Sequence, residues 1–185
     1  MSAARRRVLI PLFSSIACCL LSHTGIASAR DTVEKQGDIL AIAIPAIGLG
    51  STLFYEEGSD GTIQFLKSFA TSEVTTEVLK NVTHKERPNG GCCKSFPSGH
   101  ASAAFMGASF IHERYGLEYA LPAYIGATYV GYTRVHAKKH YTVDVVAGAA
   151  VGILSSFYFT EPYKGFNVSE SISSDGFEID ITAKW

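Results

Sequence analysis

Beyond the first 29 residues, three long stretches that contain neither a charged residue nor a histidine constrain the fold of this chain more than any other feature. They cover residues 39–55, 119–133 and 145–160, and contain 17, 15 and 16 residues. A straight helix needs about 20 residues to cross a bilayer, so each stretch is somewhat short for a full span. They suit either short membrane helices or the buried helices of a water-soluble bundle, and we favour membrane association.

Two further segments complete a predicted helical bundle. Residues 62–80 carry apolar side chains at helical spacing, although charged residues interrupt them. Residues 98–115 are rich in alanine, serine and glycine, which suits close helix packing, and Gly116 is expected to end that helix. A chain of 185 residues suits one core. We therefore predict an all-α domain, a bundle of about five to six apolar helices.

The C-terminal residues change the period of the pattern. Apolar and polar residues alternate strictly over residues 177–185, which predicts a half-buried strand. Residues 166–169 are its expected partner across a turn at residues 173–176. We predict a short C-terminal β-hairpin that covers the bundle; the alternative is a contact with the membrane edge or with a second copy.

The N-terminus has the pattern of an export signal. Three arginines at residues 5–7 precede a mostly apolar stretch at residues 8–21, and residues 27–29 read Ala-Ser-Ala, which is typical of a cleavage site. We predict that residues 1–29 are a signal peptide, or alternatively an uncleaved first membrane helix. In either case the segment that follows leaves the cytoplasm.

The remaining residues 30–185 are predicted to form one domain. Its first part, residues 31–38, is polar and is expected to be a linker. The formal net charge of the chain is -1, so no basic excess indicates a nucleic-acid partner.

The four cysteines form two adjacent pairs. Cys18 and Cys19 lie in the predicted signal, whereas Cys92 and Cys93 remain in an oxidising compartment. Neighbouring cysteines seldom meet ordinary disulfide geometry, and no second pair stands at the spacing of a zinc site. We interpret Cys92 and Cys93 as incidental or as a strained pair without a role in chemistry.

Basic residues stand at the ends of the apolar segments. If consecutive helices run antiparallel, the loop at residues 80–97 and the turn at residues 134–142 lie at the same end of the bundle. This brings Lys80, Arg87 and Arg134 together. Arginine and lysine side chains bind phosphate oxygens, and the amides at the start of a helix after Pro97 add further donors. The pattern predicts a site for a phosphoryl group.

Two histidines add reactive groups to this predicted site. His140 and Asp144 are four residues apart, so on a helical turn the carboxylate is expected to accept the N–H of one ring nitrogen. The other nitrogen is then free to attack phosphorus. His100 is placed to donate a proton to the leaving oxygen. This arrangement requires no metal and no cofactor.

Three ordered motifs between residues 80 and 144 carry this chemistry. They resemble the three-part signature of the type 2 phosphatidic acid phosphatase (PAP2) superfamily, which also includes bacterial acid phosphatases and vanadium haloperoxidases. One departure is Thr133, where the family usually has serine. The motifs are Lys80-x6-Arg87-Pro88, Pro97-Ser98-Gly99-His100 and Arg134-x5-His140-x3-Asp144.

The resemblance implies a helical bundle and a covalent phosphohistidine intermediate. It implies that His140 is the nucleophile, Asp144 its partner and His100 the acid. The residues that it implies as holding the phosphoryl oxygens are Lys80, Arg87, Ser98, Gly99 and Arg134.

We therefore expect a metal-independent phosphatase of the bacterial cell envelope, acting on a lipid phosphate or diphosphate from the periplasmic or outer side of the membrane. Isoprenyl diphosphates, phosphatidate-type lipids and lipid A are candidate substrates. The first alternative is a secreted, soluble acid phosphatase of broad specificity. A vanadate-dependent haloperoxidase and a non-catalytic binder of anionic lipids are the others.

Overall fold

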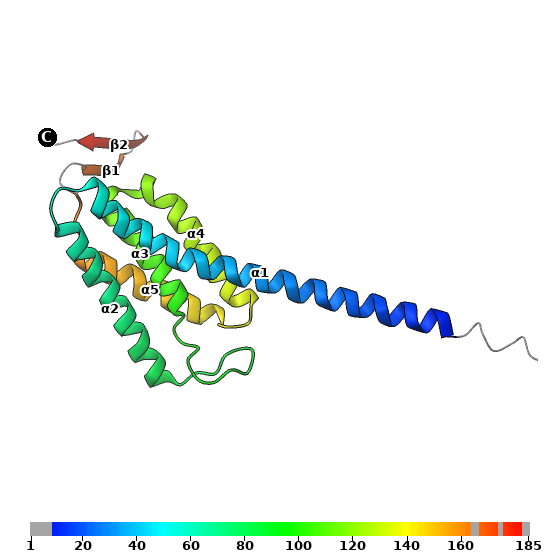
Figure 1. Ribbon diagram of the computed structural model, residues 1–185. Coiled ribbons are helices and arrows are strands. Elements are labelled where there is room, and N and C mark those ends of the chain that lie inside the picture. The colour runs from blue at the N-terminus through cyan, green and yellow to red at the C-terminus, as the bar shows by residue number, and fades with distance from the viewer. Residues whose placement is uncertain (1–8, 164–166, 174–175, 183–185) are drawn as a thin grey trace, which may run out of the picture.

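The computed structural model describes residues 9–163, 167–173 and 176–182, and the side chains of residues 31–163. The core is all-helical, as predicted, with five helices in the described part of the chain (Figure 1). A sixth helix is not among them. The helices are α1 (Leu9–Tyr55), α2 (Asp60–Thr83), α3 (Gly99–Tyr115), α4 (Leu117–His136) and α5 (Thr142–Phe159).

Two strands follow the helices, β1 (Asn167–Ser173) and β2 (Gly176–Thr182). They pair antiparallel, with Asn167 opposite Thr182 and Ser173 opposite Gly176. Their side chains lie outside the described residues. The suggested role of this segment as a cover of the bundle therefore stays a prediction.

The first helix is much longer than the sequence indicated. The predicted polar linker at residues 31–38 is wrong, because these residues are helical and belong to α1, which extends well beyond the bundle (Figure 1). Their polar side chains have partners on α4 and in the turn after it: Tyr129 donates to Gln36 Oε1 over 2.6 Å, and Lys139 Nζ lies 3.2 Å from Glu34 Oε1. Polar composition alone does not end a helix when a neighbouring helix supplies partners.

Helix α3 lies at the centre of the bundle and contacts all four other helices. Its small residues let the backbones approach closely, as the composition predicted. A Cβ added to Gly107 would lie 2.7 Å from the Pro45 backbone of α1. On the opposite side, a Cβ on Gly148 or Gly152 of α5 would overlap a carbonyl oxygen of Ser98 or Ser102. Glycine at these positions therefore sets the distances between helices.

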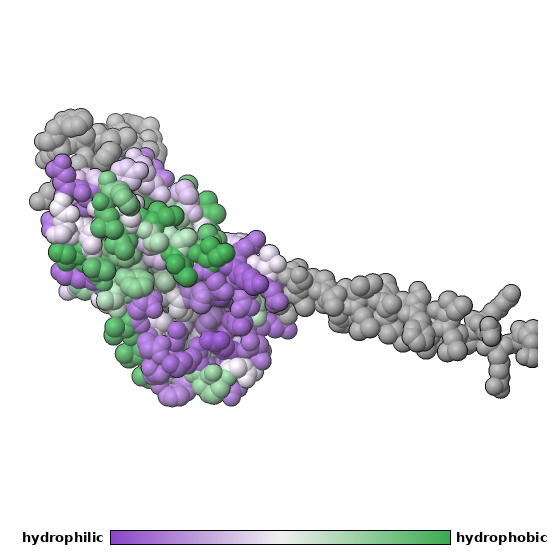
Figure 2. All heavy atoms as spheres, in the orientation of Figure 1, coloured by the Kyte–Doolittle hydropathy of each residue, from purple (hydrophilic) through white to green (hydrophobic). Residues whose placement is uncertain are grey.

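Many large apolar side chains lie on the outer faces of the bundle. Figure 2 shows apolar residues gathered over its sides, and polar residues around the loop between α2 and α3. Two helical segments, Asp31–Tyr55 and Thr142–Phe159, are long and apolar enough to cross a membrane. Only 33% of the most apolar stretch of the first segment, and 28% of that of the second, is buried inside the protein. Exposed apolar area of this extent favours the membrane alternative over a water-soluble bundle. Examples are Ile42, Phe54, Val146, Leu154 and Phe157.

Candidate functional site

The loop between α2 and α3 and the turn between α4 and α5 meet at one end of the bundle. The backbone N–H of Ser98 donates to the carbonyl oxygen of Asp144 over 2.9 Å. The ammonium group of Lys85 lies 2.6 Å from Asp144 Oδ1. The loop also contacts the turn itself, through Ser95 and His140, so the two segments that were predicted to lie at one end of the bundle are in direct contact.

His140 is buried in this contact and is held by a backbone carbonyl. Its Nδ1 lies 2.7 Å from the carbonyl oxygen of Ser95, so Nδ1–H donates there and Nε2 keeps its lone pair. The predicted bond to Asp144 is wrong, because Nδ1 and Asp144 Oδ2 are 3.9 Å apart. The expected helical spacing fails because α5 begins only at Thr142, so His140 precedes the helix.

Asp144 is fully buried and is linked to His140 through Ser95. Its carboxylate accepts hydrogen bonds from Ser95 Oγ at 2.5 Å, Lys85 Nζ at 2.6 Å and the Tyr141 amide at 2.9 Å. Ser95 thus bonds to Asp144 with its hydroxyl and to His140 with its carbonyl. Neither Ser95 nor Lys85 was predicted to belong to the site. A buried carboxylate needs a cation or donors, but their position is set by the fold.

Lys80 and Arg87 form the cationic part of the site. The Nζ of Lys80 would lie 3.0 Å from a Cβ on Gly99, so a glycine at the start of α3 leaves room for the ammonium group. The Nε of Arg87 is buried and has no hydrogen-bond partner in the described structure. Burying an unpaired guanidinium N–H is costly unless a ligand accepts from it, which indicates an anion at this position.

Ser98 and Gly99 begin α3. The Oγ of Ser98 accepts from the amide of Ala101 at 3.4 Å, a long N-cap bond. The Ser98 amide donates to the carbonyl oxygen of Asp144 and the Ser98 hydroxyl oxygen accepts from Ala101, so both groups serve the fold in this structure. The positive end of the helix still faces the site.

Arg134 is also buried, but its guanidinium bonds to α1. Its Nη1 donates to Asp38 Oδ1 over 2.7 Å and its Nη2 to the carbonyl oxygen of Glu34 over 2.6 Å. The same oxygen of Asp38 lies 3.0 Å from Nε2 of His100. One carboxylate therefore links a predicted phosphate ligand to the predicted acid. The sequence analysis missed Asp38 because it assigned this residue to a linker.

The two histidines differ in their surroundings. Burial and the nearby cations Arg87 and Lys80 lower the pKa of His140 to about 4. The Ser95 carbonyl and Asp144 raise this pKa but do not outweigh the burial. Burial and Arg134 lower the pKa of His100 below 6.5, although Asp38 raises it in part. His140 is thus neutral over most of the pH range, as a nucleophile requires.

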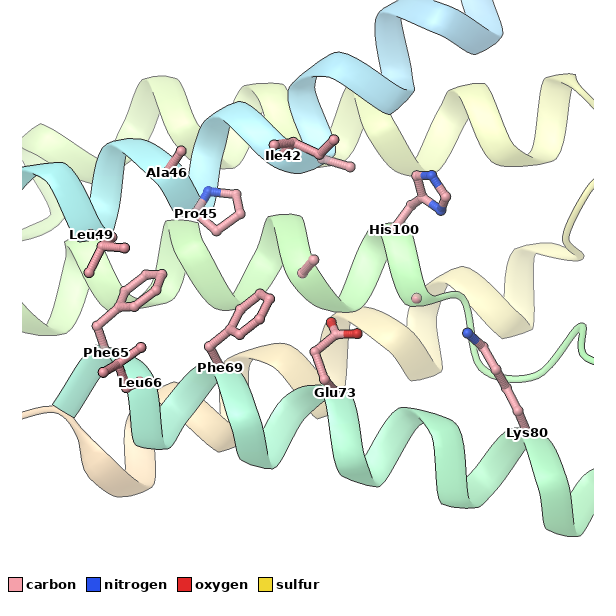
Figure 3. Close-up of a pocket in the computed structure, with 13 residues that line it drawn as sticks. Ile42, Pro45, Ala46, Leu49, Phe65, Leu66, Phe69, Glu73, Lys80 and His100 are labelled. Atoms are coloured by element: carbon pink, nitrogen blue, oxygen red, sulfur yellow. The ribbon is translucent and has the colours of Figure 1, made fainter. Parts of the chain in front are cut away.

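A groove of about 550 Å³ leads to this site between α1, α2 and α3. Lys80, Gly99 and His100 line one end, and the other end is lined by phenylalanine and aliphatic side chains (Figure 3). Glu73 lies between the two ends. The apolar lining includes Ile42, Pro45, Leu49, Phe65 and Phe69.

Two observations concern metals and cysteines. Within residues 31–163, no group of three histidine, cysteine, aspartate or glutamate side chains is arranged to hold a metal ion. Cys92 and Cys93 are joined by a disulfide in the loop between α2 and α3. The site contacts described above do not involve either cysteine.

Comparison with known proteins gives a family match and several relatives. The sequence model of the PAP2 superfamily matches residues 61–164, more than half of the chain. Over 101 residues the chain is 35% identical to a lipid A 1-phosphatase of Porphyromonas gingivalis, covering 49% of this chain and 22% of the relative. Over 76 residues it is 38% identical to a lipid A 4'-phosphatase of Helicobacter pylori, covering 40% and 38%. The chain therefore spans well under half the length of these two relatives.

A third relative and two solved structures cover more of the chain. Phosphatidylglycerophosphatase B of Bacillus subtilis is 30% identical over 142 residues, which are 66% of this chain and 68% of the relative. The crystal structure of Aquifex aeolicus LpxE matches with a TM-score of 0.53 at 20% identity, over 65% of this chain and 83% of that chain. A transmembrane PAP2-type phosphatidylglycerolphosphate phosphatase from Bacillus subtilis matches with a TM-score of 0.50 at 24% identity, over 80% and 90%. These structural matches support the helical fold.

Proposed function

The chain belongs to the PAP2 superfamily, as its three motifs predicted, and from this premise we propose that it removes a phosphate group from a membrane lipid. The observation that carries the proposal is the groove, whose apolar part ends at Lys80 and His100. A hydrocarbon chain fits the apolar part, and a phosphate fits the cationic end. The lipid phosphatases among the relatives support the same substrate class.

The proposed reaction proceeds through His140. Its Nε2 attacks phosphorus, a P–N bond forms, and the bond from phosphorus to the leaving oxygen breaks. His100 donates a proton to that oxygen. A water molecule then gives a proton to His100 and attacks phosphorus, a P–O bond forms, the P–N bond to His140 breaks, and phosphate is released. Lys80 and Arg87 stabilise the charge on the transferring group.

The contacts of Asp38 suggest how Arg134 takes part in this reaction. Asp38 bonds to Arg134 and His100 through one carboxylate oxygen, so a negative charge already lies between two groups that are proposed to act on the phosphoryl group. We infer that Asp38 is a positioning residue, which orients His100 and favours its protonated form. Arg134 supports this arrangement by holding the carboxylate of Asp38.

The cellular setting is part of the proposal. Exposed apolar faces on α1 and α5 support membrane association. The export pattern at residues 1–29 supports an active site on the outer side of the membrane.

A phosphate-release panel tests the proposed function. Purified protein in detergent is given an isoprenyl diphosphate, a phosphatidate, lipid A and a soluble phosphate ester. We expect at least one lipid to be hydrolysed with a higher kcat/KM than the soluble ester, because the groove adds binding energy for a hydrocarbon chain. Rapid cleavage of the soluble ester with no release from any lipid would instead indicate a broad-specificity phosphatase.

The rate is expected to depend on pH as a bell-shaped curve. The cycle needs neutral His140 and protonated His100. In the free enzyme the pKa of His140 is about 4 and that of His100 lies below 6.5. As pH increases, kcat/KM should therefore rise near pH 4, where His140 loses its proton. It should fall again at a pH still lower than 6.5, where His100 loses its proton. The measurement is kcat/KM from pH 3 to 9 with one substrate. A plateau that extends to pH 8 would contradict the assignment of His100 as the acid.

A phosphate ester itself titrates near pH 6, so the alkaline limb of the profile could come from the substrate as well as from His100. The variant Asp38→Asn distinguishes these two origins. The change removes a negative charge that stabilises protonated His100, while Arg134 and Lys80 continue to oppose protonation. The alkaline limb should therefore move to lower pH, and the acid limb should stay in place. Asp31→Asn, an exposed position on the same helix, is the control. An unchanged alkaline limb in Asp38→Asn would overturn the positioning role.

A further inference from the structure

Glu73 lies in the wall of the groove, where the charge of Lys80 attracts its carboxylate but, among the described residues, no hydrogen bond or ion pair holds it. It lies on α2 seven residues before Lys80, so both side chains are on the same face of the helix. Figure 3 shows its carboxylate between Phe69 and Lys80, directed toward the groove. The side chain is half-buried, and among residues 31–163 no hydrogen bond or ion pair to it is present.

An acidic side chain at this position opposes the binding of phosphate. The cationic end of the same groove is formed by Lys80, Gly99 and His100, so a phosphoryl group placed there brings negative charge toward Glu73. A hydrocarbon chain in the apolar part would remove water from the carboxylate on the other side. Both effects disfavour the binding of substrates that do not donate a hydrogen bond to Glu73.

We propose that Glu73 is a specificity-determining residue that accepts a hydrogen bond from a hydroxyl or amide N–H located between the phosphate and the hydrocarbon chain of the lipid. The inference rests on the proposed function and narrows its substrate class. It favours lipid phosphates built on a sugar or glycerol with a free donor beside the phosphoester. It disfavours isoprenyl phosphates and fully acylated glycerol phosphates, which have no donor at that position.

The order of groups along the groove supports this assignment. Cations lie at one end, the carboxylate follows, and Phe65, Leu66 and Leu49 line the far part. A lipid phosphate with a donor next to its phosphoester presents phosphate, donor and hydrocarbon in the same order. A site that keeps a buried acceptor for a substrate donor rejects an analogue without that donor, because the acceptor is then left unpaired.

A matched pair of lipids tests the inference. One is a 1-acyl glycerol 3-phosphate with a free hydroxyl at carbon 2, and the other is its 2-O-methyl ether with the same acyl chain. We expect the full-length protein in detergent to hydrolyse the hydroxyl lipid with a kcat/KM about ten- to a hundredfold higher. In Glu73→Leu this ratio should fall to about one, whereas Glu73→Gln should keep most of it, because the amide oxygen still accepts.

Glu118→Leu is the control, since Glu118 is exposed at the start of α4, away from the groove. It should leave the ratio unchanged. A ratio in Glu73→Leu equal to that of the unaltered protein would overturn the inference, as would an equal loss on both lipids. If the unaltered protein cleaves a soluble ester but neither lipid, the proposed lipid function itself fails, a result distinct from a lost preference between two cleaved lipids.

Discussion

Replacement of His140 by alanine is expected to reduce kcat by about 10⁴-fold or more, because the P–N bond of the proposed intermediate can no longer form. The Nε2 of His140 is the unbonded ring nitrogen, since Nδ1 is held by Ser95. Lys80 and Arg87 remain in His140→Ala. Binding of inorganic phosphate should therefore stay within about tenfold of its original strength, and turnover and binding become separable.

The decisive measurement is a single turnover with a labelled lipid phosphate. Rapid quenching should trap a covalently labelled histidine in the unaltered protein and none in His140→Ala. His136→Ala is the matched control, because His136 is exposed at the end of α4. It should keep full turnover and labelling. Residual turnover above about a tenth of the original in His140→Ala, or label on His100, would contradict the assignment.

The architecture was largely predictable because apolar runs and polar loops alternate along the chain. Antiparallel neighbours then place every second connection at the same end, which predicts that residues 80–97 and 134–142 lie together. The extent of α1 was not predictable in this way. Residues 31–38 look like a linker by composition, and the partners on α4 and in the turn after it explain why they are helical.

The site was predictable where residue type and order carry the information. The fixed spacings of histidine, arginine and lysine predict which side chains belong to the site, but they do not predict which atoms are in contact. The expected bond from Asp144 to His140 failed because helix α5 starts two residues after the histidine. Asp38, Ser95 and Lys85 were missed because each gains its importance from a partner far away in the sequence.

Replacement of Asp144 by alanine is expected to have the second-largest effect, on both stability and rate. The change leaves the ammonium of Lys85 and the hydroxyl of Ser95 without their partner. We expect the free energy of unfolding to fall by about 2–3 kcal/mol, less than for a fully buried pair because 34% of the Lys85 side chain is exposed. The value of kcat should fall by about 10²-fold, because the loop that holds His140 loses its fixed position.

A double-mutant cycle with Ser95→Ala distinguishes the indirect role of Asp144 from a direct one. Ser95→Ala keeps the carbonyl that holds His140 and removes only the hydroxyl that Asp144 fixes, so its own loss of kcat should be about tenfold. If Asp144 acts through Ser95, the double variant should lose little more activity than Asp144→Ala alone. Such non-additivity is the sign of two coupled residues. If the two losses multiply to about 10³-fold, Asp144 must act on His140 independently of Ser95. Lys85→Met, followed by its unfolding midpoint and kcat, separates the loss of the ion pair from the loss of the Ser95 contact, since it leaves the bond between Ser95 and Asp144 in place.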